Sequence, residues 1–291
     1  MNKELIFRSI QSKWRNLDPV WRWNTRKARK LFKKNYNPEI LDYGFYGLLK
    51  NLHKYGIAMN AVFLEVKDNF QSFLNYKNSV IEKHINSLKP FLIEYWPSRG
   101  ELDLDNPFVK LALSPVVLDI VSRYLGCWPR LYDLRLWESK PMTPGHKRIY
   151  SQSWHRDPED KKLLNMFVYL SDVDEESGPF HYVPGSHIEG PYCKTFPQVL
   201  PPRAAYYGDE AVEKVFKDNI LKCTGKAGTI IFADTAGLHR GSSDNIKPRI
   251  MFKALYVTDG NFGNKKTRYS LSQFIMDENL TEQQKYAIGI L

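Results

Sequence analysis

The chain has 291 residues, of which 43% are hydrophobic and 25% charged, a composition that can bury the core of one large domain or two small ones. No apolar run approaches the ~18–20 residues of a membrane span, and charges interrupt the N-terminal apolar runs, which argues against a secretion signal. The three cysteines are scattered and odd in number, which argues against a disulfide framework and favours the reduced thiols of a cytoplasmic protein.

The net charge of +10 is concentrated at the N-terminus. Residues 1–50 contain twelve Lys and Arg against four Asp and Glu, together with three tryptophans. Such a basic, aromatic stretch can bind nucleic acid, an anionic membrane surface or an acidic protein. Alternatively, the tryptophans pack helices against the body and leave the basic side chains in solvent. Because no nucleic-acid-binding motif is present, we expect the second arrangement, with residues 1–45 as a basic helical extension of a domain over residues 46–291.

The first part of the chain predicts mainly helices. Apolar residues at helical spacing predict a helix over residues 40–52, and the apolar run over residues 56–66 predicts a strand after it. Residues 66–86 again have helical spacing. The run SPVVLDIVSRYLG is the clearest helix, because Ser114 suits the N-cap, a proline occupies the first turn, and Gly126 suits the position just past the end.

Over residues 128–258 the pattern changes to short apolar or alternating runs, separated by Pro, Gly, Ser and Asp. The runs are RLYDLRLWES, LLNMFVYLSDV, PFHYVPGS, GTIIFAD and RIMFKALYV. They predict strands rich in aromatic and β-branched residues. Many short strands with such turns form a sandwich or barrel, so we expect a mainly β fold with flanking helices that buttress its outside.

A His-x-Asp pair, His155 and Asp157, lies within the stretch SQSWHRDPED. If this stretch is a strand, alternation directs both side chains to one face. His239, which follows the predicted strand GTIIFAD, could then complete the two-histidine, one-carboxylate triad that holds Fe(II) and leaves positions open. Arg249 begins the next predicted strand, and a guanidinium is the side chain best suited to hold a carboxylate through two hydrogen bonds.

Two alternatives compete with this triad. His187 and Glu189 form a His-x-Glu pair that can also bind metal, but the Pro and Gly residues around them predict a turn, in which the two side chains need not share a face. The polar residues of the triad could also merely satisfy hydrogen bonds inside the fold. A distal histidine followed by an arginine ten residues later favours the metal site over both.

Three segments, WHRD, YLSDVDEESGPFHYVPGSH and GLHRGSSDNIKPR, resemble the phytanoyl-CoA dioxygenase family of non-haem Fe(II)/2-oxoglutarate oxygenases. The runs SPVVLDIVSRYLG and LHKYGIAMNAVFLEV resemble the helix before that family's barrel and its opening strand. The resemblance covers roughly residues 50–258. It implies a double-stranded β-helix, a jelly roll of the cupin type, with Fe(II) as cofactor and 2-oxoglutarate and O2 as cosubstrates.

The resemblance also assigns roles to residues. It implies an iron-binding catalytic centre made of His155, Asp157 and His239. Because the PGSH turn is a fixed element of the family, His187 is implied to be structural. Arg249 matches the arginine that binds the far carboxylate of 2-oxoglutarate. Phe167 matches an aromatic residue that lines the cosubstrate pocket, and Asn165, which shares its face by alternation, is a further candidate there.

The chain departs from the family pattern at one position. Two residues after the distal histidine many members have a serine that contacts 2-oxoglutarate. This chain has Gly241 there, with Ser242 and Ser243 following. The serine contact is therefore in doubt, but the cosubstrate is not.

What the resemblance implies is a dioxygenase that hydroxylates or otherwise oxidises a small molecule and releases succinate and CO2. We accordingly expect an enzyme with a small-molecule substrate and without a nucleic-acid partner. Two alternatives stay open. One is a metal-binding or sensor protein of the same fold without turnover, and the other is a protein whose basic N-terminus binds nucleic acid or another anionic partner.

The predicted strand that begins at Arg249 also bears on the charge of the substrate. Alternation places on its inward face Met251, Lys253 and Leu255. In similar hydroxylases of the family the residue four beyond the arginine contacts substrate. Basic residues on or beside the strands of the mouth are Arg135, Arg156 and Lys162. We therefore expect Lys253 and Arg135 to bind an anionic substrate group, with the alternative that Lys253 pairs with an internal acid such as Asp133.

Overall fold

A computed structural model describes the chain over residues 3–36, 43–60, 63–81, 85–86, 89–95, 102–143, 145–241, 245–263, 269 and 279–291. The helices are α1 (Lys3–Arg15), α2 (Asp18–Asn24), α3 (Arg26–Asn35), α4 (Tyr43–Tyr55), α5 (Leu64–Val80), α6 (Pro107–Ala112), α7 (Pro115–Leu125), α8 (Asp209–Phe216) and α9 (Glu282–Ala287). The strands are β1 (Ile57–Asn60), β2 (Ile85–Asn86), β3 (Leu92–Glu94), β4 (Arg130–Ser139), β5 (Leu164–Tyr169), β6 (Phe180–Tyr182), β7 (Leu221–Cys223), β8 (Ile230–Ala233), β9 (His239–Arg240) and β10 (Arg249–Val257).

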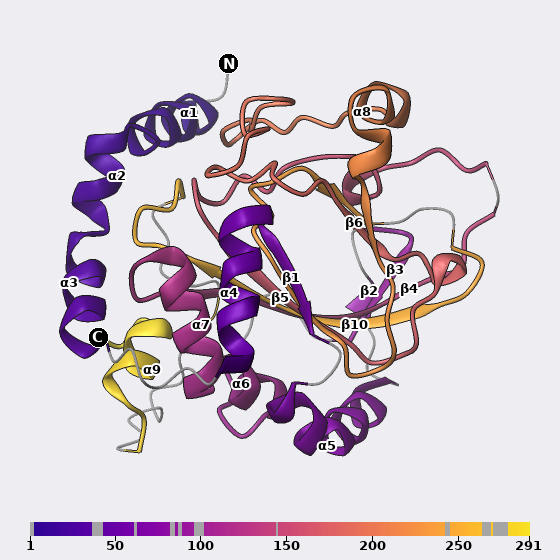
Figure 1. Cartoon of the computed structure of the whole chain (residues 1–291), viewed down its shortest axis with the longest axis horizontal. Helices are drawn as coiled ribbons and strands as arrows, with labels where there is room; N and C mark the ends of the chain where they lie inside the picture. Colours follow the sequence, from indigo (N-terminus) through magenta and orange to yellow (C-terminus); the bar gives the residue numbers. More distant parts are fainter. Residues whose placement is uncertain are drawn as a thin grey trace.

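The described strands form two antiparallel sheets. The large sheet has the order β1-β8-β5-β10-β4-β3-β2, and the small sheet has the order β7-β6-β9. Strands far apart in the sequence are neighbours in both, as β1 and β8 are, and as β4 and β10 are (Figure 1). The prediction of a mainly β fold with flanking helices is confirmed. Most of its strands lie within residues 128–258, as expected.

Alternation along β10 divides the large sheet into two faces. Phe252 and Tyr256 point outward, into a core that they share with residues of α4, α6 and α7. The ring of Phe252 stacks on that of Phe108 in α6, with centroids 4.5 Å apart. On the inward face, Arg249 and Lys253 line a cavity between the two sheets. The apolar residues on the outward face of this strand therefore hold the helices, and its charged residues face the site.

Helix α7 has the ends that its sequence predicts. The side chain of Ser114 accepts a hydrogen bond from the backbone N–H of Val117, and a proline fills the first turn. Gly126 follows the last turn with φ +70°, a conformation that favours glycine. Capping at both ends satisfies backbone groups that a helix leaves without partners. This prediction is confirmed at both ends.

The strand predicted over residues 56–66 is wrong in its second half, because α5 already begins at Leu64. Val66 and Phe73 are fully buried on one face of this helix, two turns apart. Their run is apolar without a clear period, so strand and helix cannot be separated from the sequence there. The helix predicted over residues 66–86 is also too long, since α5 ends at Val80 and Ile85–Asn86 form β2.

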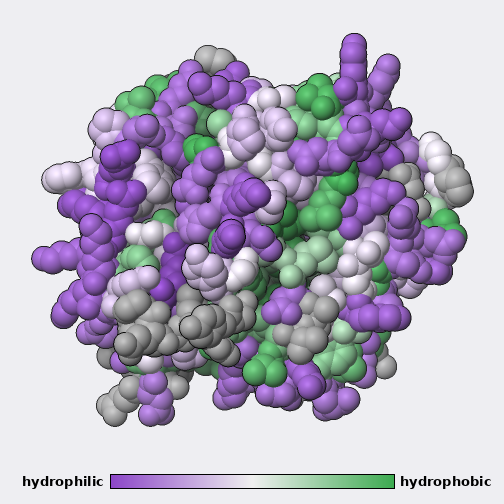
Figure 2. Space-filling model, in the orientation of Figure 1, coloured by the Kyte–Doolittle hydropathy of each residue, from purple (hydrophilic) through white to green (hydrophobic). Residues whose placement is uncertain are grey.

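Helices α1, α2 and α3 follow one another in an arc along one edge of the molecule, where hydrophilic surface predominates (Figures 1 and 2). Trp21 packs inward as predicted: it is 8% exposed, and its Nε1–H donates to Asp160 Oδ1 at 2.9 Å. The expectation that the tryptophans all pack is wrong for Trp14 and Trp23, which are 55% and 64% exposed. The Arg26 guanidinium covers the ring of Trp23 instead.

The N-terminal helices are also tied to the body by polar contacts. Arg15 is buried, and its Nε donates to the backbone carbonyl of Asn261 at 2.6 Å. The boundary predicted at residue 45 stays a prediction. None of the helices in the described ranges is both long enough and apolar enough to cross a membrane.

Candidate metal and cosubstrate site

The three residues of the predicted triad lie together at one point between the sheets. The nearest ligand atoms of His155, Asp157 and His239 are all within 4.8 Å of one another. Each histidine has its Nε2 3.7 Å from Asp157 Oδ1. Within the described part of the chain, no other three His, Cys, Asp or Glu side chains form such a group. Two imidazoles and a carboxylate therefore converge as the sequence predicts.

The backbone around His155 and Asp157 differs from the prediction. These residues are not on a regular strand, since His155 forms an isolated bridge with His239 in β9. The backbone N–H of Asp157 donates to the carbonyl of Thr235 at 2.8 Å. The next residue, Pro158, has no N–H with which to continue a ladder. The local conformation is nevertheless extended enough for both side chains to share one face.

Hydrogen bonds fix the orientation of the two histidine rings. His155 Nδ1 lies 2.9 Å from the carbonyl of Ser153, and His239 Nδ1 lies 3.0 Å from that of Gly237. Because a carbonyl only accepts, each Nδ1 carries a proton and each Nε2 presents its lone pair to the site. Burial, and next the charge of His239, lowers the pKa of His155 to about 3, and burial also lowers the pKa of His239. Both rings are thus neutral at physiological pH, the form that binds metals.

Asp157 is held as an ionised ligand. Burial acts to raise the pKa of its carboxyl, but the two histidines, then the charge of Lys253 and a hydrogen bond from Thr235, outweigh burial and lower it. Oδ2 accepts hydrogen bonds from Thr235 Oγ1 at 2.6 Å and from Asn165 Nδ2 at 3.2 Å. Oδ1 faces the histidines. Two neutral imidazoles and an oriented carboxylate fit Fe(II), whose preferred ligands they are.

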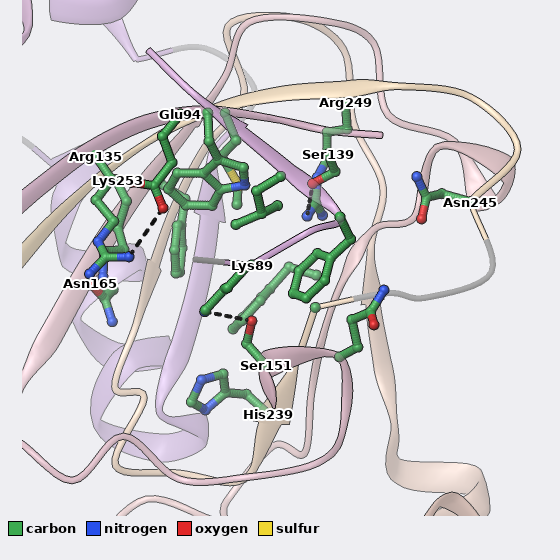
Figure 3. Close-up of a pocket in the computed structure, with 18 of the residues that line it drawn as sticks. Lys89, Glu94, Arg135, Ser139, Ser151, Asn165, His239, Asn245, Arg249 and Lys253 are labelled. Atoms are coloured by element: carbon green, nitrogen blue, oxygen red, sulfur yellow. Dashed lines mark hydrogen bonds and ion pairs between the residues drawn. The ribbon is translucent and has the colours of Figure 1, made fainter. Parts of the chain in front are cut away.

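Arg249 lies on the wall of the same cavity, 4% exposed, at the start of β10. Its Nη1 donates to the carbonyl of Gly178, and its Nη2 lies 3.4 Å from Ser139 Oγ (Figure 3). Burial lowers the pKa of this guanidinium, but an arginine keeps its charge in proteins. Its Nε has no hydrogen-bond partner among the described residues. A buried cation with an unsatisfied donor fits a site for an incoming carboxylate.

Phe167 and Asn165 both line this cavity from β5. The ring of Phe167 lies 5.0 Å from that of Phe180 in the small sheet. Asn165 donates a hydrogen bond from its amide nitrogen to Asp157, and its Oδ1 is buried without a partner among the described residues. The contact with cosubstrate predicted for these two residues stays a prediction, but Asn165 has a role that the sequence did not indicate, the positioning of Asp157.

The competing His187 and Glu189 lie outside the triad. His187 is fully buried, and its Nε2 bonds to the backbone carbonyl of His53 at 3.1 Å. Glu189 accepts from Lys162 Nζ at 2.6 Å. A β-carbon on Gly56 would come within 2.7 Å of the His187 ring, so the turn packs tightly against the end of α4. His187 therefore belongs to the packing of the fold.

The positive residues predicted at the mouth divide into two groups. Arg135 and Lys253 line the cavity, and Lys253 Nζ also lies 3.4 Å from Asp133 Oδ2, as the alternative prediction had it. Arg156 was misplaced, because its guanidinium is buried on backbone carbonyls such as those of Ser186 and Ala236. Lys162 was also misplaced, since it pairs with an acid of the PGSH turn.

Sequence reasoning missed Lys89, which reaches the cavity and donates to Ser151 Oγ at 2.9 Å (Figure 3). It precedes β3 in a region without a distinct pattern, so no signal marked it. Gly241 lines the cavity, and its N–H donates to the carbonyl of Ser151 at 2.7 Å. Ser242 and Ser243, which follow Gly241, lie outside the described residues.

Known proteins resemble the chain in sequence. The family model "Phytanoyl-CoA dioxygenase (PhyH)" matches residues 97–249. The ectoine dioxygenases of Bordetella parapertussis and Bordetella bronchiseptica are each 28% identical to it over 156 residues, 48% of this chain and 49% of theirs. The chain thus spans about half the length of the curated relatives it matches.

Solved structures share the fold at low identity. EctD from S. alaskensis with 2-oxoglutarate and 5-hydroxyectoine has a TM-score of 0.55 and 20% identity, over 78% of this chain and 80% of that one. The epimerase SnoN in complex with Fe3+, alpha-ketoglutarate and nogalamycin RO has a TM-score of 0.54 and 16% identity, over 74% and 84%. These likenesses confirm the double-stranded β-helix. Since the family model covers more than half of the sequence, the chain belongs to the phytanoyl-CoA dioxygenase family.

Proposed function

We propose that the protein is an Fe(II)- and 2-oxoglutarate-dependent dioxygenase that hydroxylates or otherwise oxidises a small molecule. The observation that carries the proposal is that the metal-binding triad and the buried Arg249 line one cavity, which is partly open to solvent. A metal site and a carboxylate-binding cation in one cavity suit a cosubstrate that contacts both.

His155, Asp157 and His239 would hold the iron. Bound there, iron(II) supplies the oxidising chemistry, in which O2 is consumed and 2-oxoglutarate is converted to succinate and CO2. The chain's own residues prepare this centre. The carbonyls of Ser153 and Gly237 keep both Nε2 atoms directed at the metal position, and Thr235 keeps Asp157 Oδ1 turned toward it.

Arg249 would orient 2-oxoglutarate by binding its far carboxylate. The unsatisfied Nε–H and the two Nη groups give the planar fork that matches a carboxylate. Phe167 and Phe180 would exclude water from the space beside the triad, which strengthens each charged contact there. The free Oδ1 of Asn165 supports a contact of that residue with a bound molecule.

The relatives support a small-molecule substrate. The two curated relatives are named ectoine dioxygenases, and the EctD structure contains 2-oxoglutarate and 5-hydroxyectoine. SnoN was solved with Fe3+, alpha-ketoglutarate and nogalamycin RO. We carry over to this chain the cofactor, the cosubstrate and the small size of the substrate.

Further expectations belong to the same proposal. The three cysteines form no disulfide, which supports a reducing compartment such as the cytoplasm. We propose no nucleic-acid partner, because the basic helices are anchored to the body by Trp21 and Arg15.

The test is to load the metal-free protein with Fe(II), add 2-oxoglutarate and O2, and measure succinate against bound iron, first alone and then with a panel of small metabolites. We expect slow succinate formation alone and strong stimulation by the true substrate. Asp157→Ala should abolish both iron binding and succinate formation. A wild-type protein that binds iron but neither binds nor converts 2-oxoglutarate would instead be the metal-binding protein without turnover.

A further inference from the structure

The cavity has a second charged end, away from Arg249. Three cationic side chains reach it from β4, β10 and the segment before β3, namely Lys89, Arg135 and Lys253. Two carboxylates accompany them, Glu94 and Asp133. Lys253, Arg135 and Glu94 lie close together at this end, and Lys89 reaches toward the middle of the cavity (Figure 3). We call these five residues the distal cluster.

Contacts within the distal cluster leave the cations close to one another. Asp133 Oδ2 pairs with both cations on the barrel strands, Arg135 Nε at 2.9 Å and Lys253 Nζ at 3.4 Å. Arg135 Nη1 lies 3.7 Å from Glu94 Oε1. Lys89 Nζ meets the hydroxyl of Ser151. Burial, and next the charges of Arg135 and Lys253, lowers the pKa of Lys89 to about 8, so the three cations oppose one another's charge.

The charges of the two ends differ once the site is filled. At the metal end, the charge of iron(II) would offset Asp157 and the near carboxylate of 2-oxoglutarate, and Arg249 would offset the far carboxylate. Among the described residues of the distal cluster, three cations face two carboxylates, so positive charge predominates there. An excess charge in a partly buried cavity is stabilised by a ligand of opposite sign.

The two ends are too far apart for the carboxylate held by Arg249 to reach Lys253 as well. Arg249 and Lys253 are four residues apart on one strand, about 13 Å in Cα spacing. Met251 lies between them on the same face, and Trp137 is its partner on β4. Phe91 and Leu92 add apolar surface to the cavity wall.

We propose, on the basis of the proposed function, that the substrate is an organic anion whose carboxylate, phosphate or phosphonate group binds Lys89 and Lys253 in the distal cluster. Its apolar part packs on Trp137 and Met251, which places the carbon to be oxidised toward the triad. Arg135 positions Lys253 through the shared Asp133. Lys89 reaches the cavity from the segment before β3, so its positive charge is supplied from outside the barrel strands.

The test uses four probes of similar size on protein loaded with Fe(II) and 2-oxoglutarate in the absence of O2. Calorimetry would measure the binding of 3-phenylpropanoate, phenylphosphonate, the neutral 3-phenylpropanamide and the cationic 3-phenylpropylammonium. We expect at least one anion to bind about tenfold or more tightly than the amide, because charge-assisted hydrogen bonds are stronger than neutral ones. A preference for the neutral or cationic probe, or no binding by either anion at millimolar concentration, overturns the proposal.

Matched variants locate the effect. Lys253→Met and Lys89→Met should each remove most of the preference for the anion. Lys110→Met, which removes the same charge from an exposed position on α6, should leave it unchanged. An equal loss of the preference for the anion in all three variants would mean that net charge alone attracts the anion. That result would overturn the proposal of a specific anion site.

The binding of 2-oxoglutarate separates this inference from the proposed function. Its dissociation constant should rise in Arg249→Leu and stay within about twofold of wild type in Lys253→Met, since the two residues hold different molecules. If 2-oxoglutarate binds normally and the anions do not, only the distal site fails. If 2-oxoglutarate weakens equally in both variants, the distal cluster is part of the cosubstrate site and the inference is wrong.

Discussion

The outward and inward faces of β10 differ in chemistry although their residues alternate along one strand. On the outward face, Phe252 and Tyr256 are fully buried and pack under the helices. On the inward face, Arg249 and Lys253 place charges in a cavity. Alternation thus lets neighbouring residues serve stability and binding separately. Substitutions on the two faces should consequently change different measurements.

The inward face also carries polar atoms that the fold leaves unsatisfied. Among the described residues, Arg249 Nε and Asn165 Oδ1 are buried without hydrogen-bond partners. On the outward side, the hydroxyl of Tyr256 donates to the carbonyl of Ala112 at 2.7 Å. Unsatisfied buried groups destabilise a protein unless a ligand completes them. Both of these atoms belong to residues that line the cavity, where a ligand could complete them.

The largest effect on stability is expected from Phe252→Ala. The ring is fully buried and stacks on Phe108, so its removal should lower the free energy of unfolding by about 3–5 kcal/mol. Denaturant titration measures this loss. Iron content of the folded protein, measured at low temperature, should be unchanged, and a parallel loss of iron would show that the two faces are not independent.

Arg249→Leu should instead impair the binding of 2-oxoglutarate and leave stability intact. The apparent Michaelis constant for 2-oxoglutarate should rise well over tenfold, because its far carboxylate loses paired, charge-assisted hydrogen bonds (about 1.4 kcal/mol per tenfold change). The free energy of unfolding should hold or increase, since a buried, partly unsatisfied cation is removed. An unchanged Michaelis constant would point to Arg135. Arg240 is the poorer substitute, because it pairs with Asp209.

A smaller effect is expected behind the metal ligands. Thr235→Val removes the hydroxyl that donates to Asp157 Oδ2 and should weaken iron binding about tenfold, as the loss of such supporting contacts does in metal sites. Thr235→Ser keeps the hydroxyl and should bind iron like wild type. Equal iron affinities for the Val and Ser variants would show that the Thr235 hydroxyl does not position Asp157.

The smallest effect concerns Asp234, which joins the sheet to the helices by accepting a hydrogen bond from Tyr124 at 2.6 Å. Burial raises the pKa of Asp234 to about 7. This group stabilises the fold fully below its unfolded pKa of about 4, and its contribution is lost as pH rises through about 7. Between about pH 5 and pH 8, Asp234→Asn should gain about 1 kcal/mol or more over wild type in free energy of unfolding. Parallel pH profiles would contradict the raised pKa.

Predictions from the sequence were best for elements whose local sequence pattern matches the tertiary contacts that they make. The run RIMFKALYV alternates, and β10 begins and ends where this run does. The run SPVVLDIVSRYLG contains its own capping residues, and α7 lies between them. The triad could be predicted because His155 and Asp157 are two residues apart and His239 follows the predicted strand GTIIFAD, and the family resemblance implied the same three residues. Prediction failed where tertiary packing decided. The run over residues 56–66 is mostly apolar without a clear period, and only its packing partners divide it into β1 and α5.

Two side chains, one missed and one misplaced, were predicted wrongly for a similar reason. Lys89 carries no local pattern, and only the fold brings it to Ser151. Arg156 looks like a residue of the mouth by position, yet it turns away to satisfy backbone carbonyls that no sequence pattern reveals. Short elements such as β7 and β9 are too brief for a periodic signal.

The most direct measurement is the iron content of three proteins, wild type, His239→Ala and His187→Ala, after anaerobic loading with Fe(II) and removal of free metal. Both histidines are buried and close in sequence to strands of the small sheet, so the two variants are matched. We predict about one iron per chain for wild type and for His187→Ala, and almost none for His239→Ala, because two remaining ligands hold Fe(II) poorly. Full iron content in His239→Ala, or its loss in a folded His187→Ala, would contradict the assignment of the metal centre.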